Sequence, residues 1–445
     1  MNEVKIVLNP LRAAVLAGVR SHVEVLVRLQ APEQPATARS ARAPLHLALV
    51  IDRSGSMAGQ PLAEAKRCAR MVIDGLQPGD RAALIVYDDQ VQTLCPLVTM
   101  DQRDVLRRAI DGIRDGGMTN LHGGWLAGAE ALAPHTGGQA LSRVILLSDG
   151  QANEGLTEVE AIARQCAELA EAGVTTSTYG LGTGFNETLM TRMADAGRGN
   201  AYYGQTAEDL ADPFSEELEL LAALCARELR LEVDAAPGVS VELLNDYAVL
   251  TGGGWRLPDL AYGGEAWALL RLTVEANLAG SSPPLPLLSV RASGSALDNR
   301  RVHAEGANLL LPVLPAEAFA AVAEDPLVRR RLVEVSVARL QQRARDAARR
   351  RDWPAVDQAL ARARAEANEH PWLEGVVSEL EALAARRDEE LLAKEAMYSS
   401  RKAMSRLAAV AECDVPGSQA DGPAFLRRKR VQGRAEGGRD SGRSA

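Results

Sequence analysis

The sequence predicts an α/β protein whose doubly wound, mostly parallel sheet is joined to a small β-sandwich and followed by a helical region. Two patterns lead to this fold class. Over residues 44–225, short apolar runs alternate with segments whose apolar residues recur every three or four positions, as buried parallel strands and their covering helices do. Residues 226–315 return to strand-like runs separated by glycine turns, and residues 316–412 have helical spacing.

Within residues 44–225, the apolar runs predict strands and the three-to-four spacing predicts helices. The expected strands are 45–51, 81–87, 144–147, 174–181 and 201–203, with 91–98 as an antiparallel edge. The expected helices are 60–76, 105–113, 121–133, 187–196 and 210–226. One further helix is expected to open at a capping box formed by Thr157 and Glu160 and to end near Gly173.

The segments on either side of this region complete the domain plan. Residues 1–43 contain two strand-like segments, which we expect to complete the β-module of residues 226–315, with the α/β domain inserted between them. The helical domain is expected at 316–412. Residues 413–445 are rich in glycine, arginine and serine, a composition typical of a disordered tail.

Length and composition indicate the number of domains and disfavour nucleic-acid binding. The chain has 445 residues, which suggests about three domains. Its 59 acidic residues outnumber its 50 basic ones, so the net charge is −9. A negative net charge disfavours a protein that coats nucleic acid, and an aromatic content of 4 % disfavours base stacking on aromatic side chains. We therefore expect no nucleic acid among the partners.

Cysteine usage and hydropathy suggest a compartment. The five cysteines lie far apart, and no two form a Cys-x-x-Cys pair, as expected of reduced, buried thiols in the cytoplasm. The apolar run at 13–19 is short and is interrupted by Arg20, unlike a signal peptide. No stretch reaches the roughly 18 to 20 apolar residues of a membrane-spanning helix. We therefore expect a cytoplasmic protein without a membrane span.

Oxygen-bearing side chains follow two of the predicted buried strands. Asp52 comes directly after the strand at 45–51, and Asp149 follows the strand at 144–147. Ligands of open α/β sheets bind beyond the carboxyl ends of the strands, where both aspartates are expected to lie. The turn after Asp52 adds the hydroxyls of Ser54 and Ser56, and a later loop adds that of Thr119.

The chemistry of this set favours a metal ion. Two carboxylates close together raise each other's pKa unless a cation lies between them. A set made only of carboxylate and hydroxyl oxygens suits a hard, partly hydrated cation such as Mg²⁺, with Mn²⁺ and Ca²⁺ as alternatives.

These residues resemble the metal-ion-dependent adhesion site of the von Willebrand factor A domain. That family has Asp-x-Ser-x-Ser, then a loop threonine, then an aspartate at a later strand end, and five residues match this pattern in order: Asp52, Ser54, Ser56, Thr119 and Asp149. The segments 50–57, 78–81 and 197–203 also look like the bacterial branch, which is similar to the domain in inter-alpha-trypsin inhibitor heavy chains. The resemblance covers residues 44–225 and does not reach the helical region.

The resemblance implies a non-enzymatic scaffold that binds other proteins in a cation-dependent way. In this family the two serines and, in the open form, the threonine are direct metal ligands, while the aspartates often act through water. An Asp or Glu of the partner protein completes the coordination. We therefore expect a divalent-cation-dependent protein-interaction module.

Two other functions remain open. Bacterial relatives of this type often work with AAA+ ATPases, which makes a non-ATPase accessory subunit, chelatase-like or chaperone-like, the alternative function. The motor would be another chain, because no Walker motif is present: Gly180–Gly184 is not followed by the lysine that such a loop needs. A hydrolase using Ser56 and His122 is a third hypothesis, but neither Ser54 nor Ser56 lies in a Gly-x-Ser-x-Gly turn.

Overall fold

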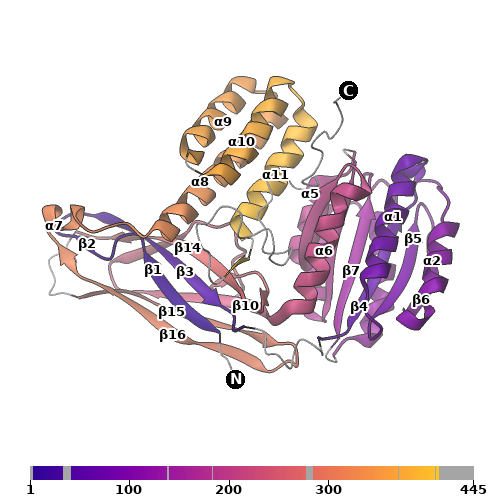
Figure 1. The fold of residues 1–445 in the computed structure, drawn as a ribbon, viewed down its shortest axis with the longest axis horizontal. Coiled ribbons are helices and arrows are strands. Elements are labelled where there is room, and N and C mark those ends of the chain that lie inside the picture. The colour runs from indigo at the N-terminus through magenta and orange to yellow at the C-terminus, as the bar shows by residue number, and fades with distance from the viewer. Residues whose placement is uncertain are drawn as a thin grey trace, which may run out of the picture. The chain divides into compact units, whose positions relative to one another are not determined.

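The computed structural model describes residues 4–33, 42–137, 140–182, 184–276, 284–368, 370–405 and 407–409. Contacts among them divide the chain into two compact units (Figure 1). One unit consists of residues 42–222 and is called the α/β unit below. The other joins the N-terminal strands to the chain that follows residue 222.

The α/β unit contains one six-stranded sheet with the strand order β6-β5-β4-β7-β8-β9, in which only β6 is antiparallel to its neighbour. Its strands are β4 (Leu45–Asp52), β5 (Arg81–Tyr87), β6 (Val91–Thr99), β7 (Leu141–Ser148), β8 (Val174–Leu181) and β9 (Arg198–Gly204). Its helices are α1 (Gln60–Gly75), α2 (Arg103–Gly112), α3 (Leu121–Leu132), α4 (Val159–Glu171), α5 (Glu187–Ala196) and α6 (Ala207–Ala223). The predicted doubly wound, mostly parallel sheet is confirmed.

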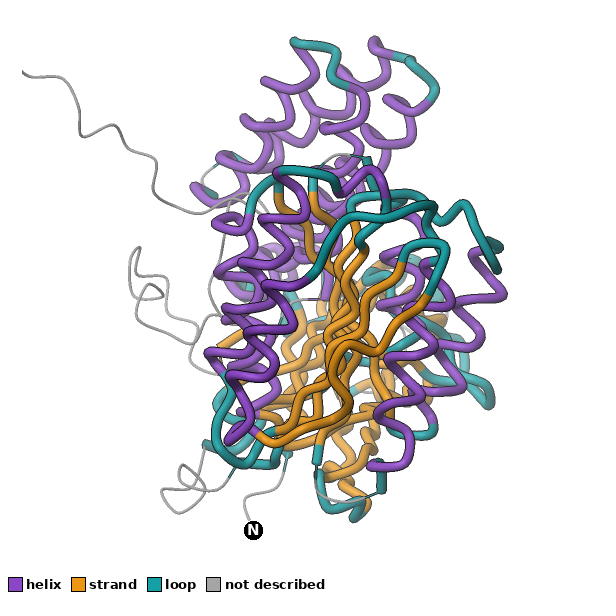
Figure 2. Tube along the Cα trace, turned by 90° about the vertical axis from the view of Figure 1, so that its right-hand side faces the viewer, coloured by secondary structure: helices purple, strands orange, loops and turns teal. Residues whose placement is uncertain are grey.

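Helices cover both faces of this sheet, as Figure 2 shows. Strand β8 demonstrates the arrangement, because successive side chains of a strand point to opposite faces. On one face, Thr176 accepts a hydrogen bond from Trp125 of α3, and Thr178 donates one to a carbonyl of α5. On the other face, Tyr179 stacks on Phe214 of α6, with ring centroids 4.1 Å apart. Strands β4 and β7 are buried on both sides, which explains their continuous apolar runs.

The second unit contains two antiparallel sheets, with the strand orders β1-β3-β14-β11 and β12-β10-β15-β16. The first is built from β1 (Lys5–Pro10), β3 (Ser21–Gln30), β14 (Gly264–Val274) and β11 (Val239–Leu243), with β18 (Ala408–Ala409) beside β14. The second is built from β12 (Trp255–Arg256), β10 (Leu224–Ala235), β15 (Leu285–Ala296) and β16 (Arg301–Leu311), with β13 (Leu260–Ala261) beside β10. Two short strands, β2 (Val15–Leu16) and β17 (Val313–Leu314), pair in parallel.

The pairing of β3 with β14 joins distant parts of the sequence. It runs over ten residue pairs, from Ser21 opposite Val274 to Gln30 opposite Glu265. The buried Glu265 carboxylate pairs with Arg28 on the neighbouring strand, at 2.7 Å between Nη2 and Oε2. The α/β unit is therefore inserted in the chain between two strands of one sheet.

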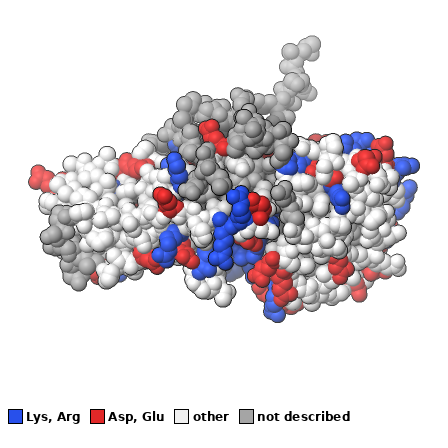
Figure 3. Space-filling model, turned by 90° about the horizontal axis from the view of Figure 1, so that it is seen from below, with Lys and Arg blue, Asp and Glu red and all other residues white. Residues whose placement is uncertain are grey.

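Several basic side chains of the second unit form ion pairs with acidic ones. Figure 3 shows lysine and arginine side chains gathered over part of one face, with aspartate and glutamate beside them. On β10, Arg230 contacts Glu232 at 2.8 Å, and Arg291 of β15 contacts Asp234 at 2.9 Å. Such mixed charge gives a weaker long-range field than a basic patch of one sign.

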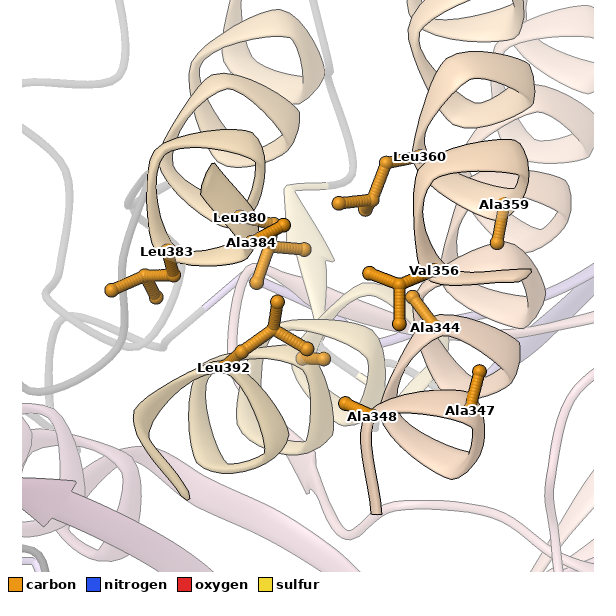
Figure 4. Close-up of a cluster of buried hydrophobic side chains, with 11 residues drawn as sticks. Ala344, Ala347, Ala348, Val356, Ala359, Leu360, Leu380, Leu383, Ala384 and Leu392 are labelled. Atoms are coloured by element: carbon orange, nitrogen blue, oxygen red, sulfur yellow. The ribbon is translucent and has the colours of Figure 1, made fainter. Parts of the chain in front are cut away.

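In the described part of the chain, four helices follow the short α7 (Ala316–Ala320): α8 (Pro326–Arg349), α9 (Trp353–Ala367), α10 (Pro371–Ala385) and α11 (Glu389–Ser405). Asp325 and Asp352 cap α8 and α9 through their side chains, and a proline stands in the first turn of each. Figure 4 shows Val356 and Leu360 of α9 pointing toward α10 and α11. The predicted helical region is confirmed, and none of the described helices is long and apolar enough to cross a membrane.

These helices are anchored on the first sheet. A buried cluster combines Trp267 and Leu269 of β14 with Val335 of α8 and Met404 of α11. The side chain of Asn245 accepts a hydrogen bond from the Leu269 amide and donates one to the Met404 carbonyl. The β-module and the helices therefore form one unit.

Two predicted boundaries were wrong. The helix expected over 210–226 ends at Ala223, and strand β10 begins at Leu224, because Ala226, Leu229 and Leu231 all turn toward a buried sheet face. The cap of α4 is Glu158, whose side chain accepts a hydrogen bond from the Ala161 amide, rather than Thr157. The predicted tail, 413–445, lies outside the described residues.

A buried ion pair links the sheet of the α/β unit to α6. Arg143 of β7 contacts Glu217, whose carboxylate also accepts hydrogen bonds from Ser177, Asn200 and Tyr202. Burial alone would raise the pKa of Glu217, but the Arg143 charge and these hydrogen bonds outweigh it, so the pKa lies below the ordinary 4.5. Glu217 is therefore ionised at neutral pH and stabilises the fold there.

Replacing Arg143 with methionine should destabilise the α/β unit by about 3–5 kcal/mol, because it leaves a buried carboxylate without its counter-ion. The loss should be complete near neutral pH. It should shrink as the pH falls, because the buried Glu217 without Arg143 takes up a proton at a higher pH than the wild-type carboxylate, whose pKa lies below 4.5. Amide hydrogen exchange of β8 and β9 measures this. The control is Arg192→Met, which breaks an exposed pair with Glu160 and should cost less than about 1 kcal/mol. Equal effects of the two variants would contradict the prediction.

Candidate metal centre

The predicted site residues lie at the carboxyl ends of three neighbouring strands. Strand β4 lies between β5 and β7. From β4 the chain continues to β5 on one side, and the later strands β7, β8 and β9 follow on the other side. The carboxyl end of β4 is therefore at the switch point of the sheet, where ligands of such sheets usually bind. Asp52 is the last residue of β4, and Ser54 and Ser56 follow in the turn that contains the short helix η2 (Gly55–Met57). Thr119 lies in the loop before α3, and Asp149 directly follows β7.

All five predicted side chains come together. The three atoms nearest to the position that a Cβ atom on Gly150 would occupy are oxygens of three of these side chains: Ser56 Oγ at 3.3 Å, Thr119 Oγ1 at 3.7 Å and Asp52 Oδ2 at 3.8 Å. Ser56 Oγ also donates a hydrogen bond to Asp149 Oδ1, at 2.9 Å, and lies 3.2 Å from Ser54 Oγ. Because residue 150 is a glycine, the space among these oxygens stays free of a side chain.

Asp52 is fully buried and is held by donors that we did not predict from the sequence. Ser148 Oγ donates to Asp52 Oδ2 at 2.6 Å, and the Tyr87 hydroxyl donates to the same oxygen at 3.3 Å. The Ser54 amide donates to Oδ1 at 2.9 Å. Burial raises the pKa of Asp52 above its ordinary value, and these hydrogen bonds oppose the rise. Tyr87 is the last residue of β5 and Ser148 the last residue of β7, the two strands beside β4. Their place at the ends of two predicted strands could have identified them from the sequence.

Asp149 is less buried and closer to solvent. Burial raises its pKa to about 6, the charge of Asp52 adds to the rise, and the hydrogen bond from Ser56 opposes it. Ser56 is exposed, whereas Ser54 and Thr119 are buried. The oxygen cluster therefore opens to solvent on the side of Ser56 and Asp149.

This donor set fits a hard divalent cation. It consists of two carboxylates and three hydroxyls, which are oxygen ligands of the kind that Mg²⁺, Mn²⁺ and Ca²⁺ take. A cation there would also favour the ionised forms of Asp52 and Asp149, whose pKa values burial raises. No group of three or more His, Cys, Asp or Glu side chains that could hold a metal ion occurs in the described part of the chain, and the set at this edge depends on hydroxyls.

Two weaker candidates have other roles in the structure. Nε2 of His122 hydrogen-bonds the side chain of Gln165 on α4, at 2.7 Å, so this nitrogen is engaged away from Ser56. Gly180, in the glycine-rich segment, packs so closely against the Phe185 ring that a Cβ atom would collide with it. That contact belongs to a strand-to-helix turn.

The fold is that of an open α/β domain, and the oxygen cluster lies at the switch point of its sheet. Residues 46–216 match the family model of the von Willebrand factor type A domain. The chain therefore contains a domain of this family, as the sequence resemblance predicted.

Relatives and solved structures agree with this assignment. An uncharacterised protein of Escherichia coli, YfbK, is 27 % identical over 195 residues, and human inter-alpha-trypsin inhibitor heavy chain H1 is 29 % identical over 202 residues. These alignments cover 43 % and 42 % of this chain, but only 34 % and 21 % of the relatives. The chain thus matches less than half of either relative.

Two solved structures share the fold over almost the whole chain. A von Willebrand factor type A protein from Catenulispora acidiphila is 18 % identical with a TM-score of 0.68, covering 91 % of this chain and 97 % of that one. VWA2, the ArnB paralog from Sulfolobus acidocaldarius, is also 18 % identical with a TM-score of 0.59, covering 90 % and 98 %. At this identity the likeness shows the fold alone.

Replacing Ser148 with alanine should destabilise the metal-free protein by about 1–3 kcal/mol, because the buried Asp52 carboxylate loses its closest hydrogen-bond donor. The matched control is Ser142→Ala on the same strand, where the buried hydroxyl has no hydrogen-bond partner. Because this absence of a partner holds among the described residues, that change should be nearly neutral. Amide hydrogen exchange of β4 and β7 in EDTA compares the two variants, and a cost for Ser142→Ala as large as that for Ser148→Ala would contradict the assignment.

Proposed function

We propose that the von Willebrand factor type A domain of this protein binds Mg²⁺ at the oxygen cluster and uses the ion to hold an acidic side chain of a partner protein. One observation carries the proposal: five oxygen-bearing side chains from three segments converge at the end of β4 around a space that Gly150 leaves free. Mn²⁺ and Ca²⁺ are alternative ions for the same donors.

The neutral and the charged side chains would have different roles at the ion. The hydroxyls of Ser54, Ser56 and Thr119 would contact the ion, and the carboxylates of Asp52 and Asp149 would neutralise it. Neutral hydroxyl ligands withdraw little of the ion's positive charge, so an outside carboxylate can still bind strongly to it. The exposed side of the cluster, at Ser56, is where such a carboxylate could approach.

The proposal describes a binding module rather than an enzyme. Von Willebrand factor type A domains are typically used for protein–protein interaction, which supports this reading. A cytoplasmic setting is part of the proposal and is supported by the buried free thiols of Cys68, Cys95 and Cys166. Cys413 lies outside the described residues.

Replacing Asp52 with alanine should abolish binding of Mg²⁺ while the fold persists. Loss of outer-shell partners of a metal site typically costs about 10–100-fold in affinity, so removing this central carboxylate should cost at least about 100-fold. Isothermal titration calorimetry of the full chain measures the affinity, and Asp104→Ala, an exposed acid on α2, serves as the control. Unchanged affinity in Asp52→Ala would refute the metal site.

Partner capture tests the second half of the proposal. The full chain and its Asp52→Ala variant would be used as baits in cell extract with Mg²⁺ and with EDTA. A protein retained only by the wild-type chain in Mg²⁺ supports metal-dependent capture. A set of bound proteins that EDTA leaves unchanged would contradict it. An ATPase among the captured proteins would favour the accessory-subunit alternative.

A further inference from the structure

We infer that an ion pair between Arg53 and Asp88 positions Thr119 for the metal, which makes Arg53 a positioning residue of the site. The inference rests on the proposed metal binding. Arg53 lies between Asp52 and Ser54. Its Nε lies 3.1 Å from Asp88 Oδ2, in an ion pair rather than a well-aligned hydrogen bond. The Arg53 side chain is 19 % exposed and that of Asp88 7 %, so solvent screens the pair only weakly.

The backbones of both residues hold the loop that carries Thr119. The Arg53 carbonyl accepts a hydrogen bond from the Gly116 amide, at 2.7 Å. The Asp88 carbonyl accepts one from the amide of Asn120, at 2.8 Å. These bonds attach the two ends of the loop, just before and just after Thr119, to the two members of the ion pair.

The loop approaches the ion pair closely, and a glycine at position 116 permits this approach. A Cβ atom on Gly116 would collide with the Asp88 carboxylate, and one on Gly117 would collide with that of Asp89. The Gly117 carbonyl accepts a hydrogen bond from the Gly55 amide, at 2.8 Å, inside the serine turn. The loop is therefore packed directly on the ion pair and on the turn that carries Ser54 and Ser56.

A second contact holds Thr119 from the opposite side. Its amide donates to the side chain of Asn153, at 2.8 Å, and its carbonyl accepts from the amides of Asn153 and Glu154, both at 3.2 Å. Thr119 is thus fixed between the ion pair and the segment after β7. Mg²⁺ requires oxygen ligands at about 2.0–2.1 Å in near-octahedral geometry, so a small displacement of the loop would weaken the bond from Thr119 Oγ1.

A double-mutant cycle tests whether Arg53 acts through Thr119. Calorimetry would give the Mg²⁺ affinity of the full chain as wild type, Arg53→Ala, Thr119→Ala and the double variant. We expect Arg53→Ala to weaken binding about 10-fold, the low end for outer-shell residues. In the Thr119→Ala background, the same change should have an effect below about 2-fold. Arg53→Lys, which keeps the charge, should recover part of the affinity.

Asp88→Asn removes the charge with little change of shape, and should weaken binding as Arg53→Ala does even if the arginine variant folds poorly. Arg192→Ala, at an exposed pair on α5, is the matched control and should bind like wild type. Full additivity of Arg53→Ala and Thr119→Ala would overturn the inference, as would wild-type affinity in both Arg53→Ala and Asp88→Asn. If Arg53 proves not to act through Thr119 but Asp52→Ala still abolishes Mg²⁺ binding, the proposed metal site stands and only the role of Arg53 is wrong. A wild-type chain that does not bind Mg²⁺ would refute the proposed function itself.

Discussion

The site depends on one constraint, the parallel pairing of β4 with its two neighbours. Parallel strands end at the same edge of a sheet, and the registers place Asp52 opposite Tyr87 on β5 and Ile51 opposite Leu147 on β7. The side chains that follow these strands must therefore share one small volume. Asp52 is fully buried there, and a buried carboxylate is costly unless it is hydrogen-bonded. Ser148, Tyr87 and the Ser54 amide meet that requirement.

The same constraint shapes the loops around the edge. Glycines stand at two of the close approaches: Gly150 lies next to the oxygens of Ser56, Thr119 and Asp52, and Gly116 lies against Asp88. The charged groups at this edge are held by contacts within the protein: Asp52 accepts hydrogen bonds from Ser148, Tyr87 and the Ser54 amide, and Asp149 accepts one from Ser56. An arrangement of this kind is pre-organised, because its donors are oriented by the fold before any ligand arrives.

The rest of the described chain forms the second unit. The chain passes from β3 of the second unit into the α/β unit and comes back to the second unit at β10. Both ends of the α/β unit are therefore connected to the second unit. The four helices of that second unit are fastened to the first sheet by the cluster around Trp267 and by Asn245. Solved structures that share the fold over nine tenths of the chain show that this combination is not peculiar to the protein.

The sequence alone determined the fold class and the types of residue at the site. Periodicity is local, so the buried strands and the helices could be predicted, and Asp52 and Asp149 could be placed at strand ends. Only the tertiary structure decided which strands are neighbours and which residues meet across them. Ser148, the Arg53–Asp88 pair and the start of β10 at Leu224 became visible only there. The physical reason is that strand order, register and burial are set by contacts between segments far apart in the chain, which a local pattern does not contain.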